Sequence, residues 1–201
     1  MSDFWDQRYA EAGYKYGTAP NAFLVEQAGR LRPGGCVLLP GDGEGRNAVW
    51  LALRGHNVLA IDSSGVGLEK ARMLAAGQGA QIATLQADLA EWRPEPASAD
   101  GVVLTFVHLP SAVRRSVHRA MAEALAPGGW LILEAFDRTQ LGRSSGGPKD
   151  PDMLYPLEAV QADFDGLLRE ELAWAGEVAL DEGPGHQGAA RVVRYLGQRP
   201  E

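Results

Sequence analysis

The 201-residue chain has an ordinary globular composition, with 45% hydrophobic residues and a formal net charge of −7. This acidic balance argues against nucleic acid or an anionic membrane as the main partner, because both call for a basic surface. The single cysteine, Cys36, excludes an internal disulfide and a thiolate metal site, which favours a cytoplasmic location. No apolar run approaches the ~20 residues that span a bilayer, and residues 1–13 contain no apolar signal core.

The first two thirds of the chain alternate between apolar runs and helical patterns. Residues 1–20 are rich in aromatic side chains, and Asn21 is expected to cap a helix that ends at residue 31. Strands are predicted over residues 36–39, 57–61, 81–86, 101–106 and 130–135. Helices are predicted over residues 46–54, 66–76 and 111–125. Five buried strands separated by helices indicate a parallel sheet covered on both faces. Cys36 belongs to the first of these strands and is therefore expected to be buried.

The pattern changes after residue 136. Residues 137–152 form a loop rich in glycine, proline and charge, and a short helix is predicted over residues 157–164. Two long alternating stretches follow, 168–180 and 188–196, and the turn between them predicts an antiparallel hairpin. No internal repeat or linker divides the sequence, so we predict a single domain over residues 1–201.

The first strand runs into a glycine-rich turn. It breaks at Pro40 into Gly41, Gly43 and Gly45, and the helix that follows begins near Arg46. A strand that turns through glycines into a helix presents bare backbone N–H groups to a ligand. The dinucleotide fingerprint G-x-G-x-x-G would require glycine at position 46. The G-x-G-x-G spacing therefore favours a different class of nucleotide-binding enzyme.

Polar residues stand where the second, third and fourth strands end. Asp62 follows the second strand, Asp88 the third and His108 the fourth. Ligands of open α/β sheets lie beyond these strand ends, where an acid after the second strand can accept hydrogen bonds from ribose hydroxyls. An acid after the third strand can accept from the amine of adenine. Asp62 and Asp88 could instead be ordinary caps or turn residues, but their coincidence with the glycine turn favours an adenosine pocket.

Over nearly its whole length the chain resembles the class I S-adenosylmethionine-dependent methyltransferases. The likeness rests on the strand–G-x-G-x-G–helix unit, the acid after strand two, D-L after strand three, L-A-P-G-G-W before strand five and the terminal hairpin. It implies an α/β fold with a Rossmann-like, doubly wound, seven-stranded sheet, mostly parallel with a C-terminal antiparallel hairpin whose final strand inserts beside the fifth. It also implies S-adenosyl-L-methionine as cofactor and S-adenosyl-L-homocysteine as product.

A narrower likeness joins YKYGTAPNAFL, PGDGEGRNAVWLA, the HLP step and the GGP–DMLY segment to the small bacterial tellurite-resistance and thiol-type methyltransferases. It implies in-line methyl transfer to a small acceptor: a thiol, a chalcogen oxyanion or another small nucleophile. Two alternatives stay open. One is a nicotinamide-dependent oxidoreductase, which Arg46 and the terminal hairpin disfavour. The other is a non-catalytic protein that binds S-adenosylmethionine in a regulatory role.

The resemblance also implies roles for the residues that match the cofactor motifs. Gly41, Asp42 and Gly43 would line the methionine portion, Asp62 would hold the ribose hydroxyls, and Ser63 would lie against the adenine. The remaining matches would contact the adenine, the methionine end and the first helical turn: Asp88, Leu89, Phe106, Val107, Arg46 and Asn47.

One position departs from this motif. Many members of the class carry an acid where this chain has Leu39, and that acid neutralises the amino group of the cofactor. We hypothesise that Asp42 or Glu44, inside the glycine turn, substitutes for it.

Three residues are candidates for the acceptor side. His108 is a candidate base or orienting group, although a loop histidine bonded for structural reasons is the alternative. His186, on the hairpin tip, could close over the site or be an exposed loop residue. Tyr155 is expected to line the acceptor pocket with Trp5 and Tyr16. A thiol or oxyanion acceptor needs little help from a base, whereas a hydroxyl or amine would gain a factor of ~10²–10⁴. Residues 1–20 and 137–152 are expected to act as lids.

Overall fold

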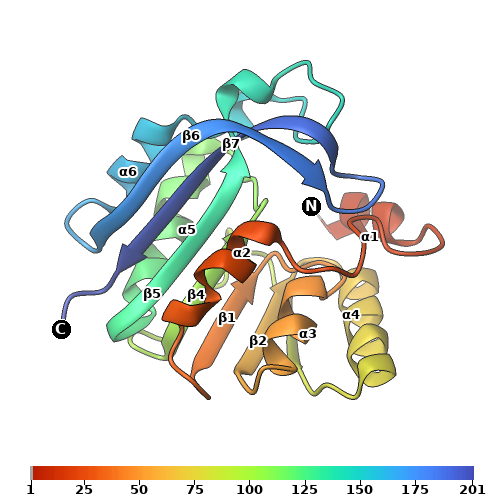
Figure 1. The fold of residues 1–201 in the computed structure, drawn as a ribbon, viewed down its shortest axis with the longest axis horizontal. Coiled ribbons are helices and arrows are strands. Elements are labelled where there is room, and N and C mark those ends of the chain that lie inside the picture. The colour runs from red at the N-terminus through yellow and green to blue at the C-terminus, as the bar shows by residue number, and fades with distance from the viewer. Residues whose placement is uncertain (1) are drawn as a thin grey trace.

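The protein is described by a computed structural model covering residues 2–201, in which helices flank both faces of one seven-stranded sheet (Figure 1). The strands are β1 (Cys36–Pro40), β2 (Asn57–Asp62), β3 (Ala83–Gln86), β4 (Ala99–Thr105), β5 (Leu125–Phe136), β6 (Arg169–Asp181) and β7 (Gln187–Gln198). The helices are α1 (Ser2–Tyr9), α2 (Ala22–Gln27), α3 (Arg46–Ala52), α4 (Gly65–Gln78), α5 (Ser111–Glu123) and α6 (Leu157–Phe164).

The strand order is β3-β2-β1-β4-β5-β7-β6. Strands β1 to β5 pair in parallel, whereas β7 is antiparallel to both β5 and β6. This arrangement confirms the predicted fold class, including the position of the last strand beside the fifth.

Each face of the sheet carries its own core. On one face α5 and α6 pack against residues such as Val102, Leu104 and Leu133, and on the other α2 and α3 pack against Leu39, Val103 and Ile132. Neighbouring residues of β4 thus point to opposite cores, as the two-residue period of a strand requires. Burying each such side chain contributes about 1.5–3 kcal/mol.

Helix boundaries follow their capping residues. The Asn21 side chain accepts a hydrogen bond from the Leu24 N–H at 2.9 Å, and the Ser64 hydroxyl accepts one from the Gly67 N–H at 3.0 Å. The predicted cap at Asn21 is therefore confirmed, although a short 3-10 turn, Ala28–Arg30, continues the α2 helix.

The structure corrects three expectations drawn from the sequence. Cys36 is exposed rather than buried, because it is the first residue of β1 and lies at the open end of the strand. The helix predicted to end at residue 125 ends at Glu123, and the L-A-P-G-G segment belongs to β5 instead. Loop residues 137–152 contain the 3-10 turn Arg138–Gln140, and the turn Pro151–Met153 overlaps their end.

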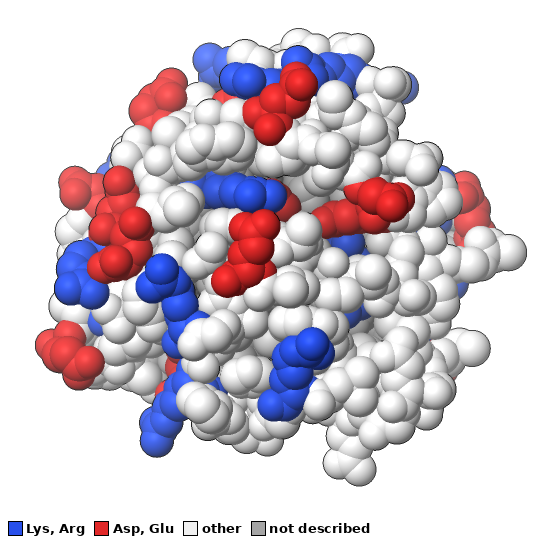
Figure 2. Space-filling model, viewed as in Figure 1, with Lys and Arg blue, Asp and Glu red and all other residues white. Residues whose placement is uncertain are grey.

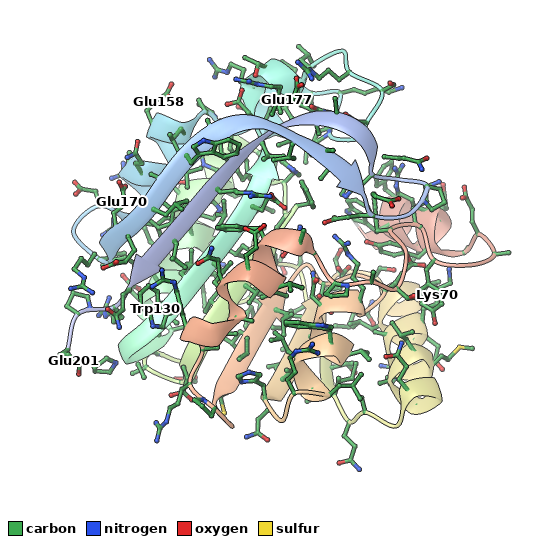
Figure 3. The ribbon with its side chains drawn as sticks, viewed as in Figure 1. Lys70, Trp130, Glu158, Glu170, Glu177 and Glu201 are labelled. Carbon is green, nitrogen blue, oxygen red and sulfur yellow. The ribbon has the colours of Figure 1, made fainter. Side chains whose placement is uncertain are left out.

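The tip of the β6–β7 hairpin lies beside the N-terminal segment (Figure 1). The Gly185 N–H donates to the Lys15 carbonyl at 2.9 Å. At the other end of this segment lies Lys70 on α4, which is labelled in Figure 3. Its ammonium binds the carbonyls of Glu11 and Gly13. Residues 10–17 are thereby held between α4 and the hairpin.

Acidic and basic side chains are interspersed on the face shown in Figure 2. Among residues 2–201 no helix has both the length and the apolar character needed to cross a membrane.

Candidate active site

A cavity of about 600 Å³ opens at the carboxyl ends of the parallel strands. Most of the predicted site residues line it: Gly41, Asp42, Arg46, Asn47, Asp62, Ser63, Asp88, Leu89, Phe106, Val107, His108 and His186. Gly43, Glu44 and Tyr155 do not line the cavity, although each contacts its surroundings. A cavity of this volume falls in the range of ordinary ligand sites.

The glycine turn requires glycine for steric reasons. Gly45, the N-cap of α3, has a φ of +87°, and a Cβ there would lie 2.7 Å from the backbone Cα of Ala71 on α4. Gly41 has a φ of +69°, and its Cβ would approach Val107 to 2.8 Å. The turn can therefore bring its backbone up to a ligand only without side chains at these positions.

Asp62 is held in place by two backbone donors. Its carboxylate accepts hydrogen bonds from the Gly43 N–H and the Ser64 N–H, both at 2.9 Å. Burial raises the pKa of this carboxyl above its usual range. The end of β2 thus presents an oriented acid to the cavity. Asp88 has two roles: it lines the cavity, and it accepts a hydrogen bond from the Ala90 N–H at 2.9 Å, which caps a turn.

The two acids of the glycine turn face different surroundings. Glu44 pairs with the Lys70 ammonium at 2.8 Å and accepts the Lys15 N–H at 2.7 Å, which directs it away from the cavity. Asp42 lines the cavity, and burial raises its pKa to about 8. The backbone N–H of Ala48 and the charge of Arg46 only partly oppose that rise. Asp42 is thus a half-buried, desolvated carboxyl without a close ion pair.

Both ring nitrogens of His108 are engaged. Nδ1 donates to the Met153 carbonyl at 2.6 Å, and Nε2 accepts the Phe136 N–H at 3.3 Å. Burial lowers the pKa of His108 to about 3, so the ring is neutral at physiological pH. This bonding pattern is that of a histidine held for structural reasons, with no lone pair left for an acceptor.

Tyr155 lies behind the cavity wall. Its buried hydroxyl accepts the Leu109 N–H at 2.6 Å and donates to the Val107 carbonyl at 3.0 Å. Burial raises the pKa of the phenol. Together with His108, Tyr155 fixes the segment of residues 107–109 that follows β4.

His186 sits in the cavity wall at the hairpin tip. Its ring centroid lies 4.4 Å from those of Tyr16 and Phe106, and the side chain is buried. Nδ1 makes no hydrogen bond and lies 3.7 Å from Oε2 of Glu182. Burial alone would raise the pKa of Glu182, but His186 and Arg46 lower it to about 2, so this carboxylate stays charged. Burial lowers the pKa of His186, which keeps its ring neutral.

A buried polar junction, which was not predicted from the sequence, links the segments around the cavity. Asn21 donates to Glu134 at 2.5 Å and to Glu182 at 2.9 Å. Arg46 binds Glu182 at 2.6 Å, and Arg194 binds Glu134 at 2.6 Å. The partners are far apart in the chain, so only polar residues within otherwise buried segments could have pointed to them.

Both predicted lid segments border the cavity. From the N-terminal segment, Phe4, Trp5, Arg8, Tyr9 and Tyr16 line it, and Gly147, Pro148, Lys149 and Asp150 line it from the loop of residues 137–152. Trp5 and Tyr16 are thus near the site, as expected. The N-terminal aromatic residues lie partly on a helix, α1, rather than on a loop.

Comparison with known proteins identifies the fold. Residues 37–129 match the family model described as a methyltransferase domain. The N-methyltransferase NodS from Bradyrhizobium japonicum, solved in complex with S-adenosyl-L-homocysteine, superposes with a TM-score of 0.70 at 17% identity, covering 100% of this chain and 98% of NodS. The chain therefore has the fold of the class I S-adenosylmethionine-dependent methyltransferases.

Two further relatives bear on this domain. A structure concerning the conversion of a disulfide bond into a thioacetal group during echinomycin biosynthesis gives a TM-score of 0.79 at 18% identity, covering 100% of this chain and 92% of its own. The 2-heptyl-1-hydroxyquinolin-4(1H)-one methyltransferase of Mycobacteroides abscessus is 28% identical over 128 residues. That match covers 62% of this chain and 55% of the relative, so it spans about half the relative's length.

Proposed function

We propose that the protein transfers the methyl group of S-adenosylmethionine to a small acceptor by in-line displacement. The observation that carries this proposal is one cavity in which the glycine turn, Asp62 and Asp88 face rings from β4, β5 and the hairpin tip. Such a reaction needs the acceptor held behind the methyl group and water kept out, more than it needs a reactive side chain.

The cofactor would bind over the ends of β1, β2 and β3. Asp62 would accept hydrogen bonds from the ribose hydroxyls, and Asp88 and Leu89 would contact the adenine. Asp42, rather than Glu44, would receive the amino group of the methionine portion, because Glu44 is already paired with Lys70. A buried carboxyl whose pKa is raised by desolvation gains most from a cationic partner.

The acceptor would lie on the side of β4, β5 and the hairpin tip. We place a thiol, a chalcogen oxyanion or another small nucleophile there, in keeping with the tellurite-resistance and thiol-type group that the sequence resembles. The mycobacterial relative is named for a hydroxyquinolinone, and one structural neighbour concerns sulfur chemistry, which supports small organic acceptors. His186 would orient the acceptor or take its proton, since both nitrogens of His108 are engaged.

The surrounding residues would prepare the site without reacting. His108 and Tyr155 hold residues 107–109, which line the cavity. Residues 1–20 and 137–152 would cover its mouth and exclude water. Little protein movement would then be required in the methyl-transfer step itself.

The direct test is methyl transfer from isotopically labelled S-adenosylmethionine to a panel of thiols, selenite, tellurite, small amines and phenols, followed by mass spectrometry. Calorimetry with S-adenosylhomocysteine and with NADH accompanies it. We expect methylated product and tight S-adenosylhomocysteine binding, with no NADH binding. Cofactor binding without turnover of any acceptor would instead support the regulatory alternative, and binding of NADH alone the oxidoreductase.

A pair of substitutions localises the cofactor. Asp62→Asn should weaken S-adenosylhomocysteine binding at least about tenfold, because the ribose loses a charged acceptor. Asp100→Asn is the matched control. Asp100 accepts the Cys36 N–H at 2.8 Å near the start of β1, and it does not line the cavity. Equal losses in the two variants would contradict the assignment of Asp62.

A further inference from the structure

The acceptor half of the cavity is walled by four rings: Tyr16, Phe106, Phe136 and His186, here called the aromatic wall. Phe106 lies 4.6 Å from Phe136 and 4.4 Å from His186 between ring centroids, and His186 lies 4.4 Å from Tyr16. The rings come from β5, the hairpin tip, the N-terminal segment and the residue that follows β4. Four separate parts of the chain therefore converge to build one surface of rings.

The backbone of Phe106 is strained to bring its ring to this wall. Its φ is +54°, in the left-handed region that a bulky side chain rarely occupies. The Phe106 N–H donates to the Glu134 carbonyl at 2.7 Å, which holds the residue in that conformation. Strain of this kind persists where the surrounding structure over-determines it, and it is concentrated at functional sites.

The cations that line the cavity are committed elsewhere or lie at its rim. Arg46 is paired with Glu182 at 2.6 Å, and the Arg8 Nε donates to the Tyr16 hydroxyl at 3.1 Å. Lys149 is exposed, next to Asp150. Among the described lining residues, none offers a fully buried positive charge without an ion pair, since Arg8 is only half-buried. A small oxyanion would therefore exchange its hydration for a partly solvated charge at best.

We propose that the acceptor is a planar, apolar organic molecule that carries a soft nucleophile, such as an aromatic thiol, and that stacks on the aromatic wall. This inference rests on the proposed function and narrows its acceptor class. Inorganic chalcogen oxyanions are then poor acceptors. Offset stacking on Phe106 would place the molecule between the hairpin tip and the cofactor.

The reaction balances for a thiolate. Aromatic thiols lose their proton to the buffer more readily than alkyl thiols do, so the anion is available at neutral pH. A lone pair of the thiolate sulfur forms the new S–CH₃ bond. The bond between the methyl group and the cofactor sulfonium breaks, and its electron pair stays on the cofactor sulfur. An anion and a cation become two neutral thioethers, a change that a water-poor aromatic wall favours.

The test compares thiophenol, cyclohexanethiol, mercaptoacetate, selenite and tellurite as acceptors for the full chain. We expect thiophenol to give the highest kcat/KM after subtraction of the uncatalysed rate, with a preference of about tenfold or more over cyclohexanethiol. Selenite and tellurite should give little product. Faster turnover of either oxyanion than of thiophenol would overturn the inference while leaving the proposed function intact.

Substitutions tie the preference to the aromatic wall. Phe106→Leu should reduce the thiophenol-to-cyclohexanethiol ratio severalfold at saturating S-adenosylmethionine, the condition used because Phe106 is also expected beside the methionine end of the cofactor. Phe164→Leu is the matched control, because Phe164 is a buried ring on α6 that stacks on Tyr195 outside the cavity. Phe136→Leu has the same expected outcome, should Phe106→Leu lose its fold. An unchanged ratio in a folded wall variant overturns the inference. Absence of turnover with every acceptor, despite S-adenosylhomocysteine binding, overturns the proposed function as well.

Discussion

At the scale of single residues, the most informative group is the desolvated carboxyl of Asp42. In the unfolded chain this group ionises near its ordinary pKa of about 3.9, whereas burial raises its pKa to about 8 in the folded protein. The folded state therefore holds a proton that the unfolded state has lost. As pH rises from about 4 to about 8, this group lowers the stability of the cofactor-free protein.

Cofactor binding should reverse that loss. If the ammonium of the cofactor faces Asp42, S-adenosylhomocysteine should raise the melting temperature more at about pH 8.5 than at about pH 6.5, because the carboxylate gains its partner only when ionised. Differential scanning calorimetry measures both shifts. Asp42→Asn should remove the difference between the two pH values, and Glu44→Gln should keep it. The same pH dependence in Asp42→Asn and the unsubstituted protein would exclude Asp42.

His186 carries the second prediction at this scale. With a phenol or amine acceptor, His186→Asn should lower kcat by a factor of ~10²–10⁴, because it removes the group that would take the proton. Since burial lowers the pKa of His186, the activity of the unsubstituted enzyme should stay level from neutral pH upward and fall only under acidic conditions. His56→Asn, outside the cavity, is the control. A pH–rate profile that His186→Asn leaves unaltered would argue for a purely structural ring.

At the scale of elements, the polar junction of Asn21, Arg46, Glu134, Glu182 and Arg194 fixes the hairpin tip to the start of α2 and α3. Asn21→Ala removes a helix cap and leaves two buried carboxylates without their shared donor. We expect it to lower the free energy of unfolding by about 1–3 kcal/mol in chemical denaturation. Asn57→Ala, which loses only an exposed bond to the Gly34 carbonyl, is the control. Similar losses of unfolding free energy in both variants would show that the buried junction stabilises the protein no more than an exposed hydrogen bond does.

The two segments that border the cavity should respond to the cofactor. Residues 9–19 and 137–152 are expected to gain protection from hydrogen exchange when S-adenosylhomocysteine binds, because both line the cavity through mostly loop-like backbone. Helix α6, which packs against α5, β6 and β7 and does not line the cavity, serves as the internal reference. Equal protection of residues 9–19 with and without the ligand would count against a lid.

The ends of helices and strands could be predicted from the sequence where nearby residues in the chain determine them. Asn21 caps α2 as expected, because an asparagine before an apolar helix satisfies its first N–H groups with its own side chain. The end of α5 was misplaced, since the apolar residues Ala124 and Leu125 continue its pattern while β4 pairs with Leu125 as a strand. That choice is made by a partner strand, which a local pattern does not contain.

The candidate site likewise contains residues that the sequence predicted and contacts that it did not predict. Gly41, Asp62 and Asp88 were predicted because each stands at a strand end, and topology brings strand ends together. The orientation of Glu44 toward Lys70 was not predicted, because it depends on how α4 packs against the N-terminal segment. Nor could the engagement of both His108 nitrogens be foreseen, since Met153 and Phe136 reach it from other parts of the chain.

At the scale of the whole molecule, the sheet joins two halves with different chemistry. The glycine turn and two acids gather over β1, β2 and β3, and rings gather over β4, β5 and the hairpin. An exposed ion pair between Arg143 and Glu177, at 2.8 Å, joins the 137–152 loop to β6. The alternation of strands and helices predicted the first half directly, whereas the order of β6 and β7 came only through the resemblance to known methyltransferases.

The position of β7 between β5 and β6 has a consequence for synthesis on the ribosome. Until residues 187–198 have left the exit tunnel, the edge of β5 that pairs with β7 is unpaired, and β6 has no neighbouring strand. The cavity cannot be closed by the hairpin tip before then, so the nascent chain should acquire cofactor affinity late. Nascent chains stalled before residue 187 would be expected to recruit chaperones at the β5 edge, because an open hydrophobic edge invites strand pairing with other chains.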